Sequence, residues 1–133
     1  MAKLASRKVD DEFNVQSAGT WGEDGLPAAH EAVQALLLRG IDLSRHRSRI
    51  VTAEIMEKAD LILTMERNHK EALVTEFPQK ENQIFSLAEM VDQSNDIADP
   101  MQQPIEAFVK IADELDGIID LGFEKILQMS KAF

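Results

Sequence analysis

A short apolar run in the middle of the chain, Leu61-Ile62-Leu63-Thr64-Met65, constrains the fold more than any other segment. The run is too short for a buried helix, and it is typical of a strand that is buried on both faces. Apolar residues at helical spacing precede it between residues 53 and 59 and follow it between residues 68 and 77. Because strands that alternate with helices are typical of parallel sheets with crossover helices, the sequence predicts an α/β fold with a small parallel sheet.

The same patterns predict the other elements along the chain. We expect a helix from Met1 to about Asp11, a strand from Phe13 to Ser17, a helix from Pro27 to Gly40, a short helix capped by Thr52, a helix that starts in a capping box at Asn68 and Glu71 and ends at Pro78, a strand from Ile84 to Leu87, and a long helix after Pro104. The long helix should bury a stripe of apolar residues and bend at Gly117 or Gly122. That stripe comprises Ile105, Phe108, Ala112, Leu115, Ile119 and Ile126.

Composition limits the possible functions. The 133 residues, 44% of them hydrophobic, fit a single domain that spans residues 1–133. A formal charge of −10 repels nucleic-acid backbones and anionic lipids, which argues against both as partners. No apolar stretch reaches the roughly 20 residues of a membrane span, so we expect a cytoplasmic protein. Cysteine is absent, which excludes disulfides and thiolate metal sites, and the three histidines are scattered. We therefore expect no metal and no cofactor.

The Asp99-Pro100 pair lies in a polar loop, from Asp92 to Gln103, that follows the last predicted strand. Proline fixes the backbone so that the preceding carboxylate projects in a defined direction. Such a carboxylate beside a leaving group can act as a general acid. On its own the dipeptide is also a common way to start a turn, so both interpretations stand at this point.

A cluster of basic residues stands out in this acidic chain: Arg39, Arg45, His46, Arg47 and Arg49. These groups could bind an anion. They could equally complement the dipole of the preceding helix and solvate a loop, which is the simpler interpretation.

Four segments in order give the chain a resemblance to a known family. They are Val15-Gln16-Ser17-Ala18-Gly19-Thr20-Trp21, then Gly40-Ile41-Asp42-Leu43-Ser44 with His46-Arg47-Ser48-Arg49, then Ala59-Asp60-Leu61-Ile62-Leu63-Thr64-Met65, and finally Asp99-Pro100. Together they resemble the low-molecular-weight protein-tyrosine-phosphatase family, which includes arginine phosphatases and a class of arsenate reductases. The resemblance implies a three-layer α/β sandwich whose parallel sheet has the strand order 2-1-3-4.

The resemblance also implies roles for individual residues. Asp99 matches the general acid that protonates the departing alkoxide or phenoxide. Ser17 matches a serine that hydrogen-bonds the phosphate-binding loop, although it could simply satisfy a turn at a strand end. Trp21 falls where the family lines the entrance to the substrate cleft, and a core position is the alternative. Arg49 matches a position that supports the active-site region, and Pro100 and Met101 belong to the acid loop.

The family's nucleophile has no counterpart in this sequence. Family members attack phosphorus with the cysteine of a Cys-x5-Arg loop, which follows a first strand and precedes Ser-Pro-Met-Ala. Met1-Ala2 match the end of that motif, so the resemblance covers the chain but lacks the strand and the loop. We therefore expect a polypeptide of this sequence to be catalytically silent. Three interpretations remain open: an N-terminally truncated phosphatase, a non-catalytic binding module, and a relative with altered, arsenate-reductase-like chemistry.

The absent strand would lie in the middle of the family's sheet. We expect the segment from Phe13 to Ser17 to pair with Leu61–Met65 instead, or a second copy of the chain to fill the gap.

The sequence indicates the substrate class less clearly than it indicates the family. Phosphotyrosine phosphatases of this family often follow Asp-Pro with aromatic residues, whereas this chain has Met101-Gln102. Phosphotyrosine remains the first expectation by family frequency, ahead of phosphoarginine and arsenate. The implied partner is a phosphorylated protein or a small phosphate ester, provided that the missing loop is supplied.

Overall fold

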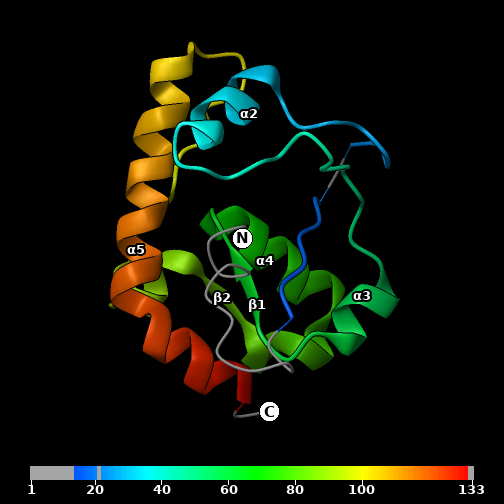
Figure 1. The fold of residues 1–133 in the computed structure, drawn as a ribbon. Coiled ribbons are helices and arrows are strands. Elements are labelled where there is room, and N and C mark those ends of the chain that lie inside the picture. The colour runs from blue at the N-terminus through cyan, green and yellow to red at the C-terminus, as the bar shows by residue number, and fades with distance from the viewer. Residues whose placement is uncertain (1–13, 21, 132–133) are drawn as a thin grey trace. The chain divides into compact units, whose positions relative to one another are not determined.

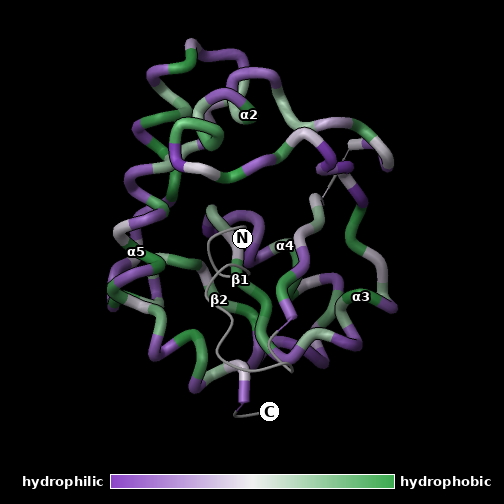
Figure 2. Tube along the Cα trace, viewed as in Figure 1, coloured by the Kyte–Doolittle hydropathy of each residue, from purple (hydrophilic) through white to green (hydrophobic). Residues whose placement is uncertain are grey.

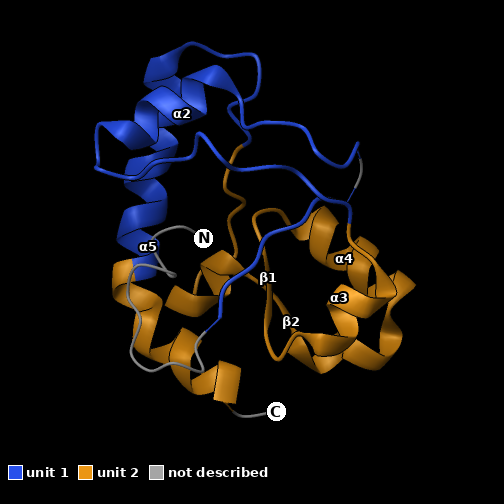
Figure 3. Ribbon diagram, turned by 45° about the vertical axis from the view of Figure 1, so that its right-hand side comes forward, with its two compact units in different colours: residues 1–50, 99–119 blue, residues 51–98, 120–133 orange. Residues whose placement is uncertain are grey.

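The structure is a computed structural model that describes residues 14–20 and 22–131 (Figure 1). The chain divides into two compact units (Figure 3). Unit 1 comprises residues 1–50 and 99–119, and unit 2 comprises residues 51–98 and 120–133. The long helix α5, Ile105–Lys131, contributes its first part to unit 1 and its last part to unit 2.

Unit 2 contains a small parallel sheet with helices around it. Its elements in order are α3 (Ala53–Lys58), β1 (Ile62–Thr64), α4 (Arg67–Glu76), the 3-10 helix η1 (Pro78–Gln83), β2 (Ile84–Ser86) and the 3-10 helix η2 (Leu87–Val91). Strands β1 and β2 run parallel, with Ile62 opposite Ile84 and Thr64 opposite Ser86. This arrangement confirms the predicted α/β fold with a small parallel sheet.

The helix starts of unit 2 show where local sequence signals suffice. The Thr52 hydroxyl accepts a hydrogen bond from the Ile55 N–H at 3.2 Å, as predicted for the cap of α3. The capping box predicted at Asn68 is wrong, because α4 begins at Arg67 after Glu66. Its first free N–H, on Arg67, is instead taken by the Asp96 carboxylate at 2.8 Å, which is 29 residues further along the chain.

The core of unit 2 lies between its helices and its sheet. Met56, Leu73, Phe77 and Ile84 are buried together in one cluster. Each is an apolar residue that the helix and strand patterns place on an inward face. Because these residues come from α3, α4, the residue directly after α4, and β2, the cluster ties both helices to the sheet.

A charged network joins η2 to its neighbours within unit 2. The Glu89 carboxylate accepts hydrogen bonds from the Lys70 ammonium at 3.0 Å and from the Ser86 N–H at 2.6 Å, the latter as part of a capping box. The Lys125 ammonium donates to the Glu89 carbonyl at 3.0 Å and to the Asp92 carboxylate at 3.1 Å. Partial burial acts to raise the pKa of the Glu89 carboxyl, but the hydrogen bonds from Lys70 and Ser86 and the charge of Lys70 together hold that pKa below its usual value.

In unit 1 the helix α2, His30–Leu37, starts later than predicted. Its termination by Gly40 agrees with the prediction, although the last helical residue is Leu37. Pro27 lies three residues before the helix, where it forms an isolated bridge with Arg47. Gly40 ends the helix with a left-handed backbone, φ +75°, and its N–H donates to the Leu37 carbonyl at 3.0 Å.

The predicted strand from Phe13 to Ser17 is not found in the part of it that is described. Residues 14–17 form no strand, and β1 pairs only with β2 among the described residues, so the expected pairing with Leu61–Met65 is wrong there. Phe13 lies outside the described residues, as does the helix expected from Met1 to Asp11. The Ser17 carbonyl and the Gly19 N–H are instead bonded to Arg49, and Gly19 bridges Ile50, so this segment is paired with residues 49 and 50 of its own unit.

Helix α5 confirms the predicted stripe, and polar and apolar residues alternate along it (Figure 2). All six predicted stripe residues are buried or half-buried. The helix continues through Gly117 and Gly122 without a break. Gly122 is buried where α5 meets η2 within unit 2, and a Cβ there would lie 3.0 Å from both the Cβ and the carbonyl oxygen of Met90. The glycine therefore permits a close approach of the two helices.

We expect Gly122→Ala to destabilise the protein, because the Met90 backbone would have to move to admit the methyl group. The loss should be about 1–3 kcal/mol, less the gain of about 0.5–1 kcal/mol that alanine brings to a helix. Gly117→Ala is the control, because Gly117 is exposed on the same helix and a Cβ there meets nothing within 4 Å. That change should stabilise the protein. Urea unfolding followed by circular dichroism measures both, and equal effects would contradict the close approach.

Candidate active-site region

An open hollow of about 230 Å³ in unit 1 gathers several of the residues predicted from the sequence. Ser17 and Arg49 lie in its wall, and His46 from the basic cluster joins them. The remaining lining residues are Ala18, Gly19, Glu23, Ser48 and Ile50. The hollow therefore lies between residues 17–19 with Glu23 on one side and residues 46–50 on the other, which the sequence separates by more than 20 positions.

Ser17 and Arg49 are in direct contact. The Arg49 Nε donates to the Ser17 carbonyl at 3.0 Å, and the Gly19 N–H donates to the Arg49 carbonyl at 2.8 Å. The guanidinium thus fixes the backbone that carries the Ser17 hydroxyl, and it remains exposed at the hollow. This contact joins two positions that the family resemblance singled out separately.

The loop of residues 23–26 is tied to the other side of the hollow by Ser48. The Ser48 hydroxyl donates to the Glu23 carbonyl at 2.6 Å and accepts from the Leu26 N–H at 3.0 Å. Asp24 adds a further link, since its carboxylate accepts from the Ile50 N–H at 2.7 Å. Ser48 belongs to one of the four family segments, but no role was predicted for it or for Asp24, because no local pattern marks a bond between residues more than 20 positions apart.

Asp99 lies on the loop before α5, and it does not line the hollow. Its carboxylate is exposed and accepts a hydrogen bond from the Met101 N–H at 2.9 Å, which closes a turn around Pro100. Gln102 continues the turn with φ +65°, and the Gln103 N–H donates to the Pro100 carbonyl at 3.0 Å. Met101 is 61% exposed. The predicted acid therefore has a defined local conformation and is open to solvent.

The basic cluster does not act as one unit. Arg39 forms ion pairs with Asp113 and Asp116 of α5 within unit 1, so it links the turn after α2 to α5. Arg47 donates to the His46 carbonyl at 2.7 Å. Only His46 and Arg49 of the cluster line the hollow, which narrows any anion-binding role to these two residues.

Trp21 lies outside the described residues. Among residues 14–20 and 22–131, no group of three His, Asp or Glu side chains is arranged to hold a metal ion. None of the helices in that part of the chain is both long and apolar enough to span a membrane.

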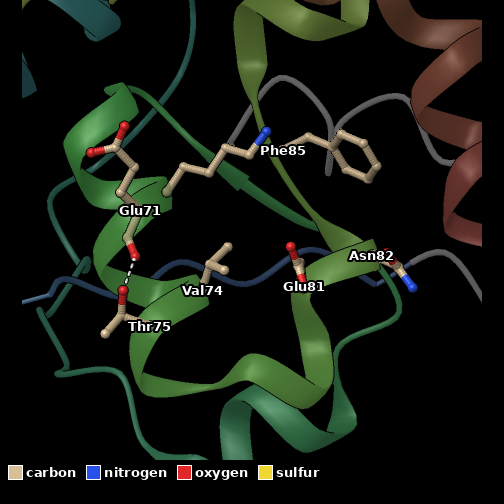
Figure 4. A pocket seen from close by; sticks show the side chains of 7 residues that line it. Glu71, Val74, Thr75, Glu81, Asn82 and Phe85 are labelled. Carbon is tan, nitrogen blue, oxygen red and sulfur yellow. Dashed lines mark hydrogen bonds between the residues drawn. The ribbon is translucent and has the colours of Figure 1, made fainter.

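Unit 2 has a larger open hollow, of about 520 Å³, that contains none of the predicted site residues (Figure 4). The Lys70 ammonium lies 5.6 Å from the centre of the Phe85 ring at its edge, and the same ammonium is paired with Glu89. Val74 and Thr75 from α4 and Glu81 from η1 also line it. With its one lysine already paired, the surface offers no concentrated charge for a phosphorylated ligand.

Comparison with known proteins identifies the family. The sequence profile of the family named "Low molecular weight phosphotyrosine protein phosphatase" matches residues 1–128. The chain belongs to this family. Its relatives include the probable low molecular weight protein-tyrosine-phosphatase EpsP of Ralstonia nicotianae, 32% identical over 95% of this chain and 86% of EpsP. A protein-arginine-phosphatase of Geobacillus stearothermophilus is 34% identical over 94% of this chain and 84% of that protein.

Solved structures of phosphatases also resemble the chain. The YwlE arginine phosphatase from Geobacillus stearothermophilus matches with a TM-score of 0.86 at 34% identity, covering 96% of this chain and 82% of YwlE. The low molecular weight protein tyrosine phosphatase from T. tengcongensis matches with a TM-score of 0.79 at 40% identity, covering 83% of this chain and 76% of that chain. These similarities confirm the family that the sequence motifs suggested.

Proposed function

We propose that residues 1–133 form one phosphatase-like domain, which acts on phosphorylated proteins only when a cysteine-bearing loop completes it, with phosphotyrosine as the first substrate class. The observation that carries the proposal is the family match over residues 1–128, together with an Asp-Pro turn immediately before the last helix. In this proposal Asp99 gives its proton to the leaving oxygen as the bond to phosphorus breaks. An exposed carboxylate in a fixed turn is suited to that task.

The other predicted residues would support the cleft. The Ser17 hydroxyl would hydrogen-bond the phosphate-binding loop, and Arg49 would hold Ser17 in place through the observed 3.0 Å hydrogen bond. Trp21 would line the entrance, while Pro100 and Met101 would form the side of the cleft near the acid. None of these residues can replace a thiolate as the nucleophile, because none combines high nucleophilicity with partial ionisation at neutral pH.

Under this proposal, the polypeptide of 133 residues has no phosphatase activity, and a form that carries the cysteine has it. The printed sequence contains no cysteine, so it cannot form a cysteinyl-phosphate. For the test, we call the extended chain a form to which an apolar strand, a Cys-x5-Arg loop and Ser-Pro are added directly before Met1. Such a loop supplies the thiolate, backbone N–H groups around the phosphate oxygens, and a bidentate arginine.

The rate of hydrolysis of an aryl phosphate measures the difference in activity between the 133-residue chain and the extended chain. We expect the extended chain to hydrolyse it, the 133-residue chain to give no rate above buffer, and a Cys→Ser change in the added loop to abolish the gain. Hydrolysis by the highly purified 133-residue chain would overturn the proposed silence. A folded extended chain without activity would overturn the assignment of phosphatase chemistry.

Phosphoarginine is the second candidate substrate. Two observations favour it: the similarity to the arginine phosphatase of Geobacillus stearothermophilus in both sequence and fold, and the exposed Met101 where an aromatic residue would face a phenyl ring. Initial rates of the extended chain on a phosphotyrosine peptide and on a phosphoarginine peptide of the same sequence discriminate between the two. A higher kcat/KM for the phosphoarginine peptide would reverse the order given above.

A further inference from the structure

Ser48 places all of its hydrogen-bonding groups on one loop. Its N–H donates to the Leu26 carbonyl at 2.7 Å, and its carbonyl accepts from the Gly25 N–H at 2.7 Å. Its hydroxyl donates to the Glu23 carbonyl at 2.6 Å and accepts from the Leu26 N–H at 3.0 Å. Four hydrogen bonds from one half-buried residue thus hold residues 23–26 against residues 46–50.

The hydroxyl is the part of this arrangement that depends on the side chain. It must donate and accept at the same time, and serine and threonine are the small side chains that can do both. The two backbone bonds would survive a change to alanine, whereas the two hydroxyl bonds would not. The Glu23 carbonyl and the Leu26 N–H would then be left to water.

The position of this loop gives the contact a functional meaning. Glu23 and Ser48 both line the 230 Å³ hollow, next to Ser17 and Arg49. The loop follows Trp21 after a single residue, Gly22. A loop that is free to move here would change the shape of the hollow without altering Ser17 or Arg49.

We infer that Ser48 is a positioning residue, which fixes the loop of residues 23–26 as one wall of the substrate cleft and thereby sets how well a phosphorylated side chain fits. The role in substrate fit rests on the proposed phosphatase function. The tether itself does not, since it follows from the hydrogen bonds of unit 1.

The tether is tested in the 133-residue chain by amide hydrogen exchange. We expect Ser48→Ala to speed exchange of the Leu26 N–H by about 5-fold, because it loses a hydrogen bond worth roughly 1 kcal/mol. Ser48→Thr should restore the parent exchange rate, because threonine keeps the hydroxyl. The matched control is Ser44→Ala, since the Ser44 hydroxyl bonds to the Asp42 carboxylate in its own turn and not to the loop of residues 23–26.

The role in substrate fit is tested in the extended, cysteine-bearing chain. There Ser48→Ala should raise KM for a phosphotyrosine peptide about threefold or more and change kcat less than twofold, with Ser48→Thr close to the parent. A loss of kcat alone, or no change in KM, would overturn the positioning role even if the extended chain is active. Unchanged exchange of the Leu26 N–H in Ser48→Ala would overturn the tether. Inactivity of the extended parent would instead count against the proposed phosphatase function, and the exchange result would stand.

Discussion

Asp99→Asn in the extended, cysteine-bearing chain should lower kcat for a phosphotyrosine peptide by about 100- to 10,000-fold, the usual contribution of a general acid. Asparagine has nearly the shape of aspartate, and its side-chain oxygen can still accept the hydrogen bond that the Met101 N–H now gives to Asp99 at 2.9 Å. The turn before α5 should therefore persist. What the variant loses is the proton for the leaving oxygen.

The leaving group provides the decisive readout. Tyrosine, with a pKa near 10, needs the proton as its bond to phosphorus breaks, whereas a nitrophenol leaves readily as the anion. Asp99→Asn should thus affect the phosphotyrosine peptide far more than p-nitrophenyl phosphate. Asp60→Asn is the control, because it makes the same chemical change at an exposed carboxylate of unit 2. Equal losses on both substrates would mean that Asp99 acts in binding or folding and not as an acid.

Sequence reasoning succeeded where the deciding interactions are local. Thr52 caps α3 through a bond to a residue three positions away, and Gly40 ends α2 through a bond of the same span. The apolar run around Ile62 and the segment at Ile84 formed strands because burial of consecutive apolar residues leaves few alternatives. Such signals lie within one turn or one strand, so the printed sequence displays them.

Prediction from the sequence failed where the hydrogen-bond partner that decides the local structure is distant along the chain. The helix predicted to begin in a capping box at Asn68 is capped instead by Asp96, and nothing near residue 68 announces that. The strand predicted to end at Ser17 is not formed by residues 14–17, and the Ser17 carbonyl bonds to Arg49, 32 positions away. The hydrogen bonds of Ser48 to the loop of residues 23–26 could not be predicted for the same reason. The family resemblance supplied Ser17 and Arg49 as separate positions, and only the structure showed that they touch.

Leu87→Ala should produce the largest loss of stability among the substitutions considered, about 2–5 kcal/mol in the free energy of unfolding. Leu87 is 1% exposed at the start of η2, directly after β2. Truncation to alanine removes about three carbon atoms, worth about 0.8 kcal/mol each in transfer free energy, and it leaves a cavity that costs more. Since a domain of this size has about 5–15 kcal/mol in total, the variant should unfold at a clearly lower urea concentration.

Leu121→Ala is the matched control, because it makes the same change at a leucine of unit 2 that is 83% exposed. It removes little buried surface, and alanine is slightly better than leucine in a helix, so its effect should lie within about 0.5 kcal/mol of zero. Urea unfolding followed by circular dichroism compares the two variants. Similar m-values would show that both unfold from equally compact states, so that the difference in midpoint reflects burial. A loss below about 1 kcal/mol for Leu87→Ala would contradict the tight packing of η2, because a buried leucine cannot be truncated at so small a cost unless its surroundings collapse onto the space.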